Sequence, residues 1–122
     1  MSWPREPTGD VGLPITRLSA EAWVTSLLLI RTAVATSFVN KFGGHTLEIL
    51  TRPSKHRKPA HIEATWVNDS HLRVALSHRV VDSIVADMLK CCFLVGGPSH
   101  FHLDCRLNGA ESEVTLTFEF PN

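Results

Sequence analysis

The sequence has no excess of charge of either sign. Twelve lysine and arginine residues balance twelve aspartate and glutamate residues in a chain of 122. A general nucleic-acid binder needs a basic surface to meet the phosphates. We therefore do not expect nucleic acid to be a partner, and any charged partner has to be met by a local group of side chains.

Cysteines are few, and their arrangement does not suit disulfide bonding. Cys91, Cys92 and Cys105 are an odd number, and the first two are adjacent. A secreted disulfide framework has an even number of spaced cysteines. Residues 1–7 carry acid and proline where a signal peptide needs an apolar run. We therefore expect a reduced protein of the cytoplasm.

No uninterrupted apolar run is long enough to cross a bilayer. The most apolar stretch covers residues 20–42, but Glu21, Arg31 and several serines and threonines interrupt it. A membrane helix needs about 20 consecutive apolar residues. The sequence therefore predicts no membrane span, and instead a largely buried helix over residues 19–42 that ends at Gly43-Gly44.

The motifs of common catalytic sites are also absent. The chain has no Cys-x-x-Cys pair, no glycine-rich phosphate loop and no Gly-x-Ser-x-Gly elbow. The three cysteines fall on the apolar sides of predicted elements, which favours buried small side chains over a reactive thiol. We therefore expect neither an enzyme nor a bound cofactor.

The clearest patterns that are present lie after residue 45. Residues 46–50, 61–67 and 71–76 alternate between apolar and polar side chains, which predicts three strands. Residues 77–95 repeat apolar side chains at a spacing of three and four, which predicts a helix. Residues 99–120 alternate again on both sides of a turn and predict a hairpin.

Together these elements predict an α+β fold. Two helices, over residues 19–42 and 77–95, would pack against a mostly antiparallel sheet of about five strands to give a two-layer sandwich. Residues 1–14 hold three prolines and two glycines and are predicted to be an irregular leader. Residues 15–122 would then form a single domain of ordinary size.

The final hairpin carries the sharpest candidate site. His100, His102 and Asp104 alternate along one strand and should share a face, with Glu119 or Thr117 opposite them. Two imidazoles and a carboxylate can hold a metal ion. The same alternation also describes a strand face exposed to water, and this is the interpretation we favour, with no metal bound. The residues of this hairpin predicted to contact a partner are His100, His102, Asp104, Arg106 and Glu119.

A second candidate contact surface is a basic segment. Proline breaks helices, and two prolines mark residues 52–58: Pro53 lies inside the segment and Pro59 directly after it. This predicts an exposed loop whose cations could meet an acidic protein surface or a phosphate. The candidate contacts there are Lys55, Arg57 and Lys58.

The region from about residue 71 to residue 120 resembles a known family. A strand ending near Leu76 precedes the helix Val-Val-Asp-Ser-Ile-Val-Ala-Asp-Met-Leu and a Gly-Gly-Pro break. The motif His100-Phe101-His102 and a last apolar strand follow. This order resembles that of bacterial polymorphic-toxin immunity proteins with a C-terminal strand-helix-strand unit that carries a His-x-His motif. The resemblance implies a cytoplasmic protein that neutralises a cognate toxin domain by direct binding.

The leading hypothesis is therefore a non-catalytic binding protein of the immunity or antitoxin type. Two alternatives stay open. One is a small metal-dependent enzyme that uses His100, His102 and Asp104 as ligands. The other is a subunit of a larger assembly that is joined through the apolar helix over residues 20–42.

Overall fold

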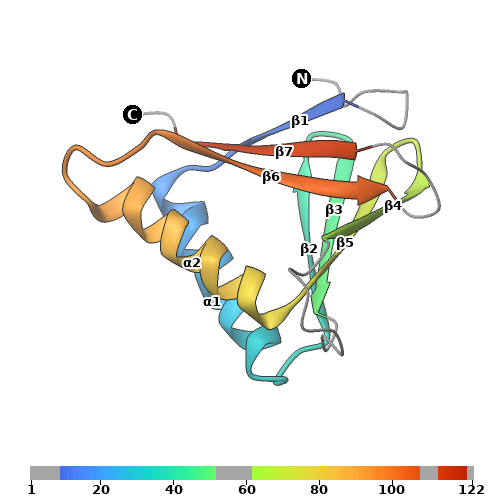
Figure 1. The fold of residues 1–122 in the computed structure, drawn as a ribbon, viewed down its shortest axis with the longest axis horizontal. Helices are drawn as coiled ribbons and strands as arrows, with labels where there is room; N and C mark the ends of the chain where they lie inside the picture. The colour runs from blue at the N-terminus through green and yellow to red at the C-terminus, as the bar shows by residue number, and fades with distance from the viewer. Residues whose placement is uncertain (1–8, 52–61, 108–112, 121–122) are drawn as a thin grey trace.

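The computed structural model describes residues 9–51, 62–107 and 113–120. Within these ranges the chain contains both helices and strands, as an α+β protein should (Figure 1). The elements are β1 (Gly9–Pro14), α1 (Arg17–Arg31), β2 (Ser37–Phe42), β3 (His45–Thr51), β4 (Glu63–Asn68), β5 (His71–Leu76), α2 (His78–Phe93), β6 (His100–Leu107) and β7 (Glu113–Glu119).

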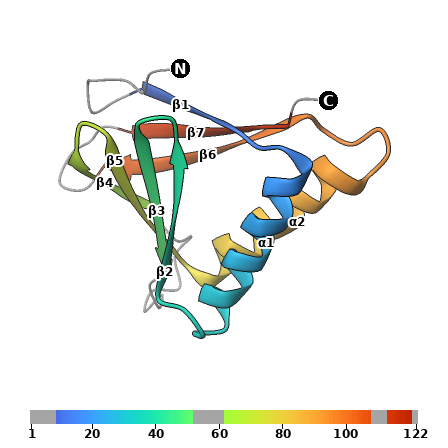
Figure 2. The ribbon, with the colours of Figure 1, turned by 180° about the vertical axis from the view of Figure 1, so that it is seen from behind.

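The described strands form one sheet of seven, in the order β1-β7-β6-β4-β5-β3-β2. Parallel pairs (β1 with β7, β4 with β6, β3 with β5) alternate with antiparallel pairs across the sheet. The register between β4 and β6 contains two residue pairs, whereas that between β6 and β7 contains seven. The sheet bends at this short joint into a first wing (β1, β7, β6) and a second wing (β4, β5, β3, β2), as Figure 2 shows from behind.

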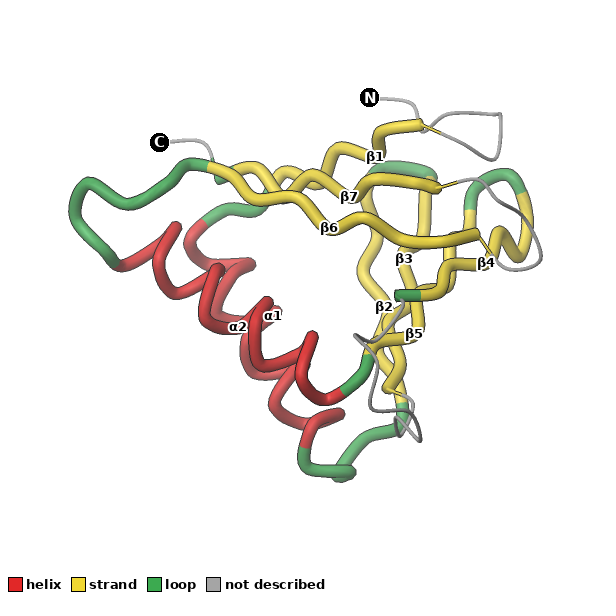
Figure 3. The backbone as a smooth tube through the Cα atoms, in the orientation of Figure 1, coloured by secondary structure: helices red, strands yellow, loops and turns green. Residues whose placement is uncertain are grey.

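The predicted two-layer sandwich with a mostly antiparallel sheet of about five strands is wrong. The sheet has seven strands of mixed direction and curls into a half barrel. The prediction missed β1 and β2, which form the two outer edges of the sheet. The helices lie on the concave side of the curl and close it, rather than covering a flat sheet (Figure 3).

The two helices run antiparallel and pack against each other. At one end Arg31 of α1 donates from Nε to Asp82 Oδ1 of α2 at 3.0 Å. At the other end the guanidinium carbon of Arg17 lies 5.0 Å from the centroid of the Phe93 ring. Each helix turns one apolar stripe inward, as expected for an amphipathic helix. The buried residues are Ala20, Trp23, Leu27 and Ile30 on α1, and Val81, Ile84 and Met88 on α2.

Trp23 joins the helices to both wings of the sheet. Its side chain is 2% exposed. Its ring centroid lies 5.5 Å from that of Phe38 and 6.4 Å from that of Phe42, both on β2 in the second wing. It also lies 5.5 Å from the ring centroid of Phe118 on β7 in the first wing, edge to face. One apolar core therefore fills the space inside the curl.

The predicted helix over residues 19–42 is wrong beyond Arg31. Ala33 follows the helix with a left-handed φ of 63°, and the Val34 N–H donates to the Leu29 carbonyl at 3.0 Å. These are the features of a Schellman ending, which normally uses glycine. The chain then turns and forms β2, so the apolar helix proposed as an assembly interface over residues 20–42 does not exist in that form.

Gly43 and Gly44 form a hairpin turn and do not end a helix. Phe42 pairs with His45 across the turn, so the loop between β2 and β3 has two residues. Gly43 has a φ of 64°, a conformation that two-residue hairpin loops require and glycine adopts without strain.

Part of the segment predicted as an irregular leader is a strand. Residues 1–8 lie outside the described residues, but Gly9–Pro14 forms β1 and pairs in parallel with β7. Val11 and Leu13 are fully buried. Their burial makes β1 part of the core of the fold.

The later elements agree with the sequence patterns. The predicted helix over residues 77–95 is α2, and the Ser77 hydroxyl caps it by accepting from the Val80 N–H at 3.3 Å. The predicted strands at 46–50 and 71–76 are β3 and β5, and the predicted hairpin is β6 with β7. The helices of the described ranges are α1 and α2. Neither of them is long and apolar enough to cross a membrane.

Candidate functional site

The candidate residues of the final hairpin lie on the outer face of the first wing. Along β6, the side chains of His100, His102, Asp104 and Arg106 are exposed, and Cys105 between them is buried. This is the alternation that the sequence predicts. The face is turned away from the helices, because the residues between these positions point into the core.

The strand register brings polar groups from three strands together on this face. On β7, Glu119 lies opposite His100, and Thr117 lies opposite His102, as expected from the sequence. On the other side of β7, β1 places Gly12 beside Thr117. Since β1 was not predicted, its contribution to this face could not be foreseen.

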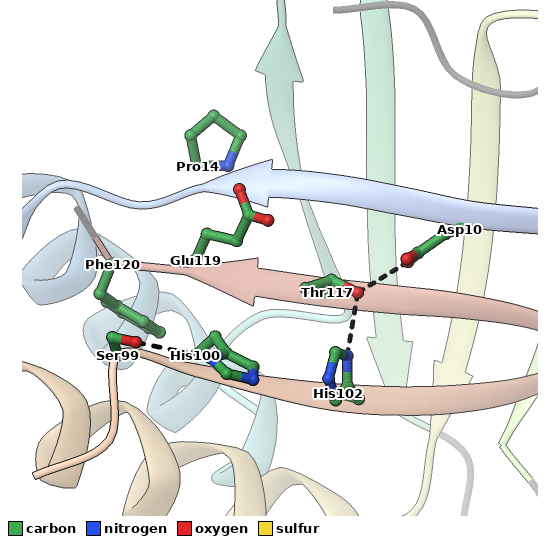
Figure 4. A pocket seen from close by; sticks show the side chains of 8 residues that line it. All are labelled: Asp10, Pro14, Ser99, His100, His102, Thr117, Glu119 and Phe120. Carbon is green, nitrogen blue, oxygen red and sulfur yellow. Dashed lines mark hydrogen bonds between the residues drawn. The ribbon is translucent and has the colours of Figure 1, made fainter.

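A hollow of about 560 Å³, open to solvent, lies in the polar face of the first wing (Figure 4). On β1, Gly12 stands between Asp10 and Pro14, which line the hollow from the same side of the strand. The lining residues are Asp10, Pro14, Ser99, His100, His102, Thr117, Glu119 and Phe120.

A chain of hydrogen bonds crosses the floor of the hollow. Thr117 donates from Oγ1 to Asp10 Oδ1 at 2.7 Å, and His102 Nδ1 lies 3.0 Å from the same Thr117 oxygen. A hydroxyl carries a single proton, and a carboxylate can only accept. The Thr117 proton therefore points at Asp10, and His102 must donate from Nδ1. The neutral imidazole then leaves its Nε2 as an acceptor.

Hydrogen bonding holds the side chains of His100 and Glu119 less firmly than those of His102 and Asp10. The ring centroids of His100 and His102 are 5.1 Å apart, with an angle of 64° between the rings. The Ser99 hydroxyl lies 3.5 Å from His100 Nδ1. Within the described ranges, the Glu119 carboxylate has no hydrogen-bond or ion-pair partner. It is available to a ligand.

The remaining candidates lie beside the hollow or outside the described residues. Asp104 accepts from Thr115 Oγ1 at 2.8 Å, and neither Asp104 nor Arg106 lines the hollow. Over residues 9–51, 62–107 and 113–120, no three histidine, cysteine, aspartate or glutamate side chains lie close enough together to hold a metal ion. The basic residues Lys55, Arg57 and Lys58 fall in the range 52–61, outside the described residues.

Four residues that line the hollow are not among the site residues that the sequence predicts: Asp10, Pro14, Ser99 and Phe120. Asp10 and Pro14 fall in the segment predicted as an irregular leader. The run Asp10-Val11-Gly12-Leu13-Pro14 does alternate between polar and apolar positions, which is the signal of a half-buried strand. Its prolines and glycines obscured that signal.

The cysteines do not provide a nucleophile. Burial, together with the nearby carboxylates of Asp104 and Glu113, raises the pKa of the Cys105 thiol to about 12. Burial also raises the pKa of Cys91 and of Cys92. Since the thiolate is the reactive form, these side chains are poor nucleophiles at neutral pH.

Comparison with known protein families, with curated proteins and with solved structures finds no match to this chain. The interpretation of the hollow and its surrounding face therefore depends on the chemistry of their own residues.

Proposed function

We propose that this protein is a non-catalytic binding protein that contacts another protein through the polar face of the first wing. The observation that carries the proposal is the charge of this face. The described residues of β1, β6 and β7 present four carboxylates and a single guanidinium on it: Asp10, Asp104, Glu113 and Glu119 against Arg106.

An acidic face of this kind favours a partner with a basic surface. Complementary charge accelerates encounter and selects the correct partner and orientation. The face is also open, and its hollow offers a recess into which a partner side chain can insert. Central, desolvated side chains usually dominate the energy of such contacts.

The type of partner is proposed from the family resemblance. The His-x-His motif that carries the resemblance to immunity proteins is His100-Phe101-His102, and both imidazoles line the hollow. We therefore take the partner to be a cognate bacterial toxin domain in the cytoplasm, which the protein neutralises by covering a basic surface. The protonated state of the cysteines at neutral pH agrees with a role that needs no chemistry of its own.

The test is co-expression with the product of the neighbouring reading frame. The wild-type chain should restore growth and co-purify with that product. The double substitution of Asp10→Asn with Glu119→Gln should abolish both effects, because it removes two carboxylates of the face. The matched control is Glu21→Gln on the exposed surface of α1, which removes a carboxylate far from the face and should change neither effect.

A neighbouring gene that encodes a metabolic enzyme would overturn the toxin assignment. Full protection by the double variant would overturn the assignment of the contact face.

A further inference from the structure

We infer that the hollow in the first wing receives the guanidinium group of an arginine side chain from the partner protein. This inference rests on the proposed function, because it names the group that the polar face would bind. It depends on which atoms in the hollow can accept hydrogen bonds and which can donate them.

Most of the fixed polar groups in the hollow are acceptors. The Thr117 proton is used by Asp10, and the Nδ1 proton of His102 is used by Thr117. What faces the hollow is therefore the His102 Nε2 lone pair, with the carboxylate of Glu119 and the remaining lone pairs of Asp10. A ligand for this set has to bring several N–H or O–H donors.

The charge of the hollow excludes an anionic ligand. Two carboxylates line it, and no lysine or arginine of the described residues does. A phosphate or carboxylate would be repelled by both acids at short range. A bare metal ion does not fit either, because the described residues offer no set of three ligating side chains. An organic cation remains.

A guanidinium matches this arrangement better than an ammonium does. It is planar and carries five N–H donors in a fixed fork, so it can meet acceptors on different strands at once. The acceptors here come from β1, β6 and β7. Guanidinium planes also stack on flat rings, and the hollow has two imidazoles with Pro14 and Phe120 beside them.

The first test measures the tautomer of His102 in the full chain. Two-bond ¹H–¹⁵N correlation spectra at neutral pH should show His102 protonated at Nδ1 and bare at Nε2. Thr117→Val removes the hydroxyl with little change of shape, so the Nε2–H tautomer should gain population. A wild-type spectrum dominated by the Nε2–H form would overturn the inference, since Nε2 would then be a donor.

The second test measures binding of small probes to the full chain without any partner. We expect N-acetyl-arginine amide to bind with millimolar affinity and to shift the His102 ring resonances. The neutral isostere N-acetyl-citrulline amide and inorganic phosphate should not bind, and N-acetyl-lysine amide should bind more weakly than the arginine probe. Binding of phosphate, or equal binding of the citrulline probe, would contradict the inference.

Substitutions in the full chain test whether the arginine probe binds in the hollow. Glu119→Gln should weaken binding of the arginine probe about tenfold, the usual effect of losing a charge-assisted hydrogen bond. Glu113→Gln is the matched control, because Glu113 is exposed on the same face of β7 but does not line the hollow. It should weaken binding far less than Glu119→Gln does, because it changes only the general charge of the face. Equal losses from both substitutions would mean that the probe senses only the general charge of the face.

The two proposals fail in different ways. If the arginine probe binds in the hollow but no toxin is neutralised, the guanidinium subsite stands and the proposed function is wrong. If a toxin is neutralised equally well by wild type and by Glu119→Gln, the proposed function stands and the guanidinium subsite is wrong.

Discussion

Ala33 holds a backbone conformation that glycine adopts more readily. Its φ of 63° ends α1 in a Schellman turn. An L-residue in this region costs roughly 1–2 kcal/mol relative to glycine, and the greater freedom of glycine in the unfolded chain offsets about 0.4–1 kcal/mol of that. The position is therefore not optimised for stability.

Ala33→Gly should raise the free energy of unfolding by about 0.5–1 kcal/mol, because glycine adopts this left-handed conformation without the steric cost that alanine has. Urea denaturation should show a higher midpoint with an unchanged slope. The control is Ala22→Gly, at an exposed position within α1, which should lower the free energy of unfolding by about 1 kcal/mol. A loss of stability from Ala33→Gly would contradict the assigned ending of α1.

Gly97 permits a close approach of two backbone segments. A Cβ at this position would clash with the carbonyl oxygen of Lys90, in the last turn of α2. Gly97→Ala should therefore destabilise the protein by about 1–3 kcal/mol, as overpacking usually does. Gly44→Ala in the β2–β3 turn provides the comparison, because nothing lies within 4 Å of its Cβ position. Similar melting temperatures for the two variants would be evidence against this packing of the α2–β6 connection.

At the scale of elements, the sequence predicts best where the signals are local. The helix α2 has a serine cap, a regular apolar spacing and a glycine-proline stop, and β6 and β7 alternate clearly. These signals need no knowledge of the rest of the chain. The end of α1 could not be predicted, because Ala33 stands where glycine would mark the stop.

The edge strands were missed for related reasons. The alternation of β2 is hidden within one long apolar stretch, and the glycine pair Gly43-Gly44 after it is also typical of a helix end. A turn of two glycines between alternating segments is also a hairpin signal, and that interpretation would have found β2.

The pairing of β3 with β5 predicts how stability depends on pH. The side chain of Glu48 on β3 is 17% exposed and accepts from His71 Nε2 at 2.9 Å and from Arg73 Nε at 3.2 Å, both on β5. Burial raises the pKa of Glu48, but the hydrogen bonds from Arg73 and His71 outweigh burial and leave this pKa below its ordinary value of 4.5. A carboxyl whose pKa is lower in the folded state stabilises the fold above its unfolded pKa. That stabilisation is lost as the pH falls through the folded pKa.

Glu48→Gln should therefore lower stability at neutral pH and should flatten the loss of stability on acidification below about pH 4.5. Denaturation curves at a series of pH values measure both effects. Glu21→Gln on the exposed surface of α1 serves as the control and should keep the wild-type pH profile. A Glu48→Gln profile parallel to wild type would show that this carboxylate does not link the two strands.

On the scale of the whole molecule, the curl of the sheet depends on contacts between distant segments. The bend lies at the two-residue joint between β4 and β6, and Trp23 fills the space on its concave side. Neither feature has a local sequence signal. The candidate site also combines local signals with distant contacts. The alternation of β6 predicts the exposed imidazoles, but no local pattern predicts that Asp10 lies beside them.

Trp23→Ala should cost about 3–5 kcal/mol, as removal of a large buried aromatic side chain usually does. Because the ring contacts β2 and β7 at once, hydrogen exchange should speed up in both wings. Trp23→Phe, which keeps an aromatic ring, should cost less. Loss of protection in the second wing alone would mean that the two wings fold independently.

The contact between Thr117 and Asp10 spans 107 positions of the chain. During synthesis β1 leaves the ribosome well before its partner β7 has been made. The nascent chain therefore has no hollow and no acidic face until β7 is synthesised and pairs with β1. A chain cut short before β7 would have neither, so recognition of a partner through this face has to wait for β7.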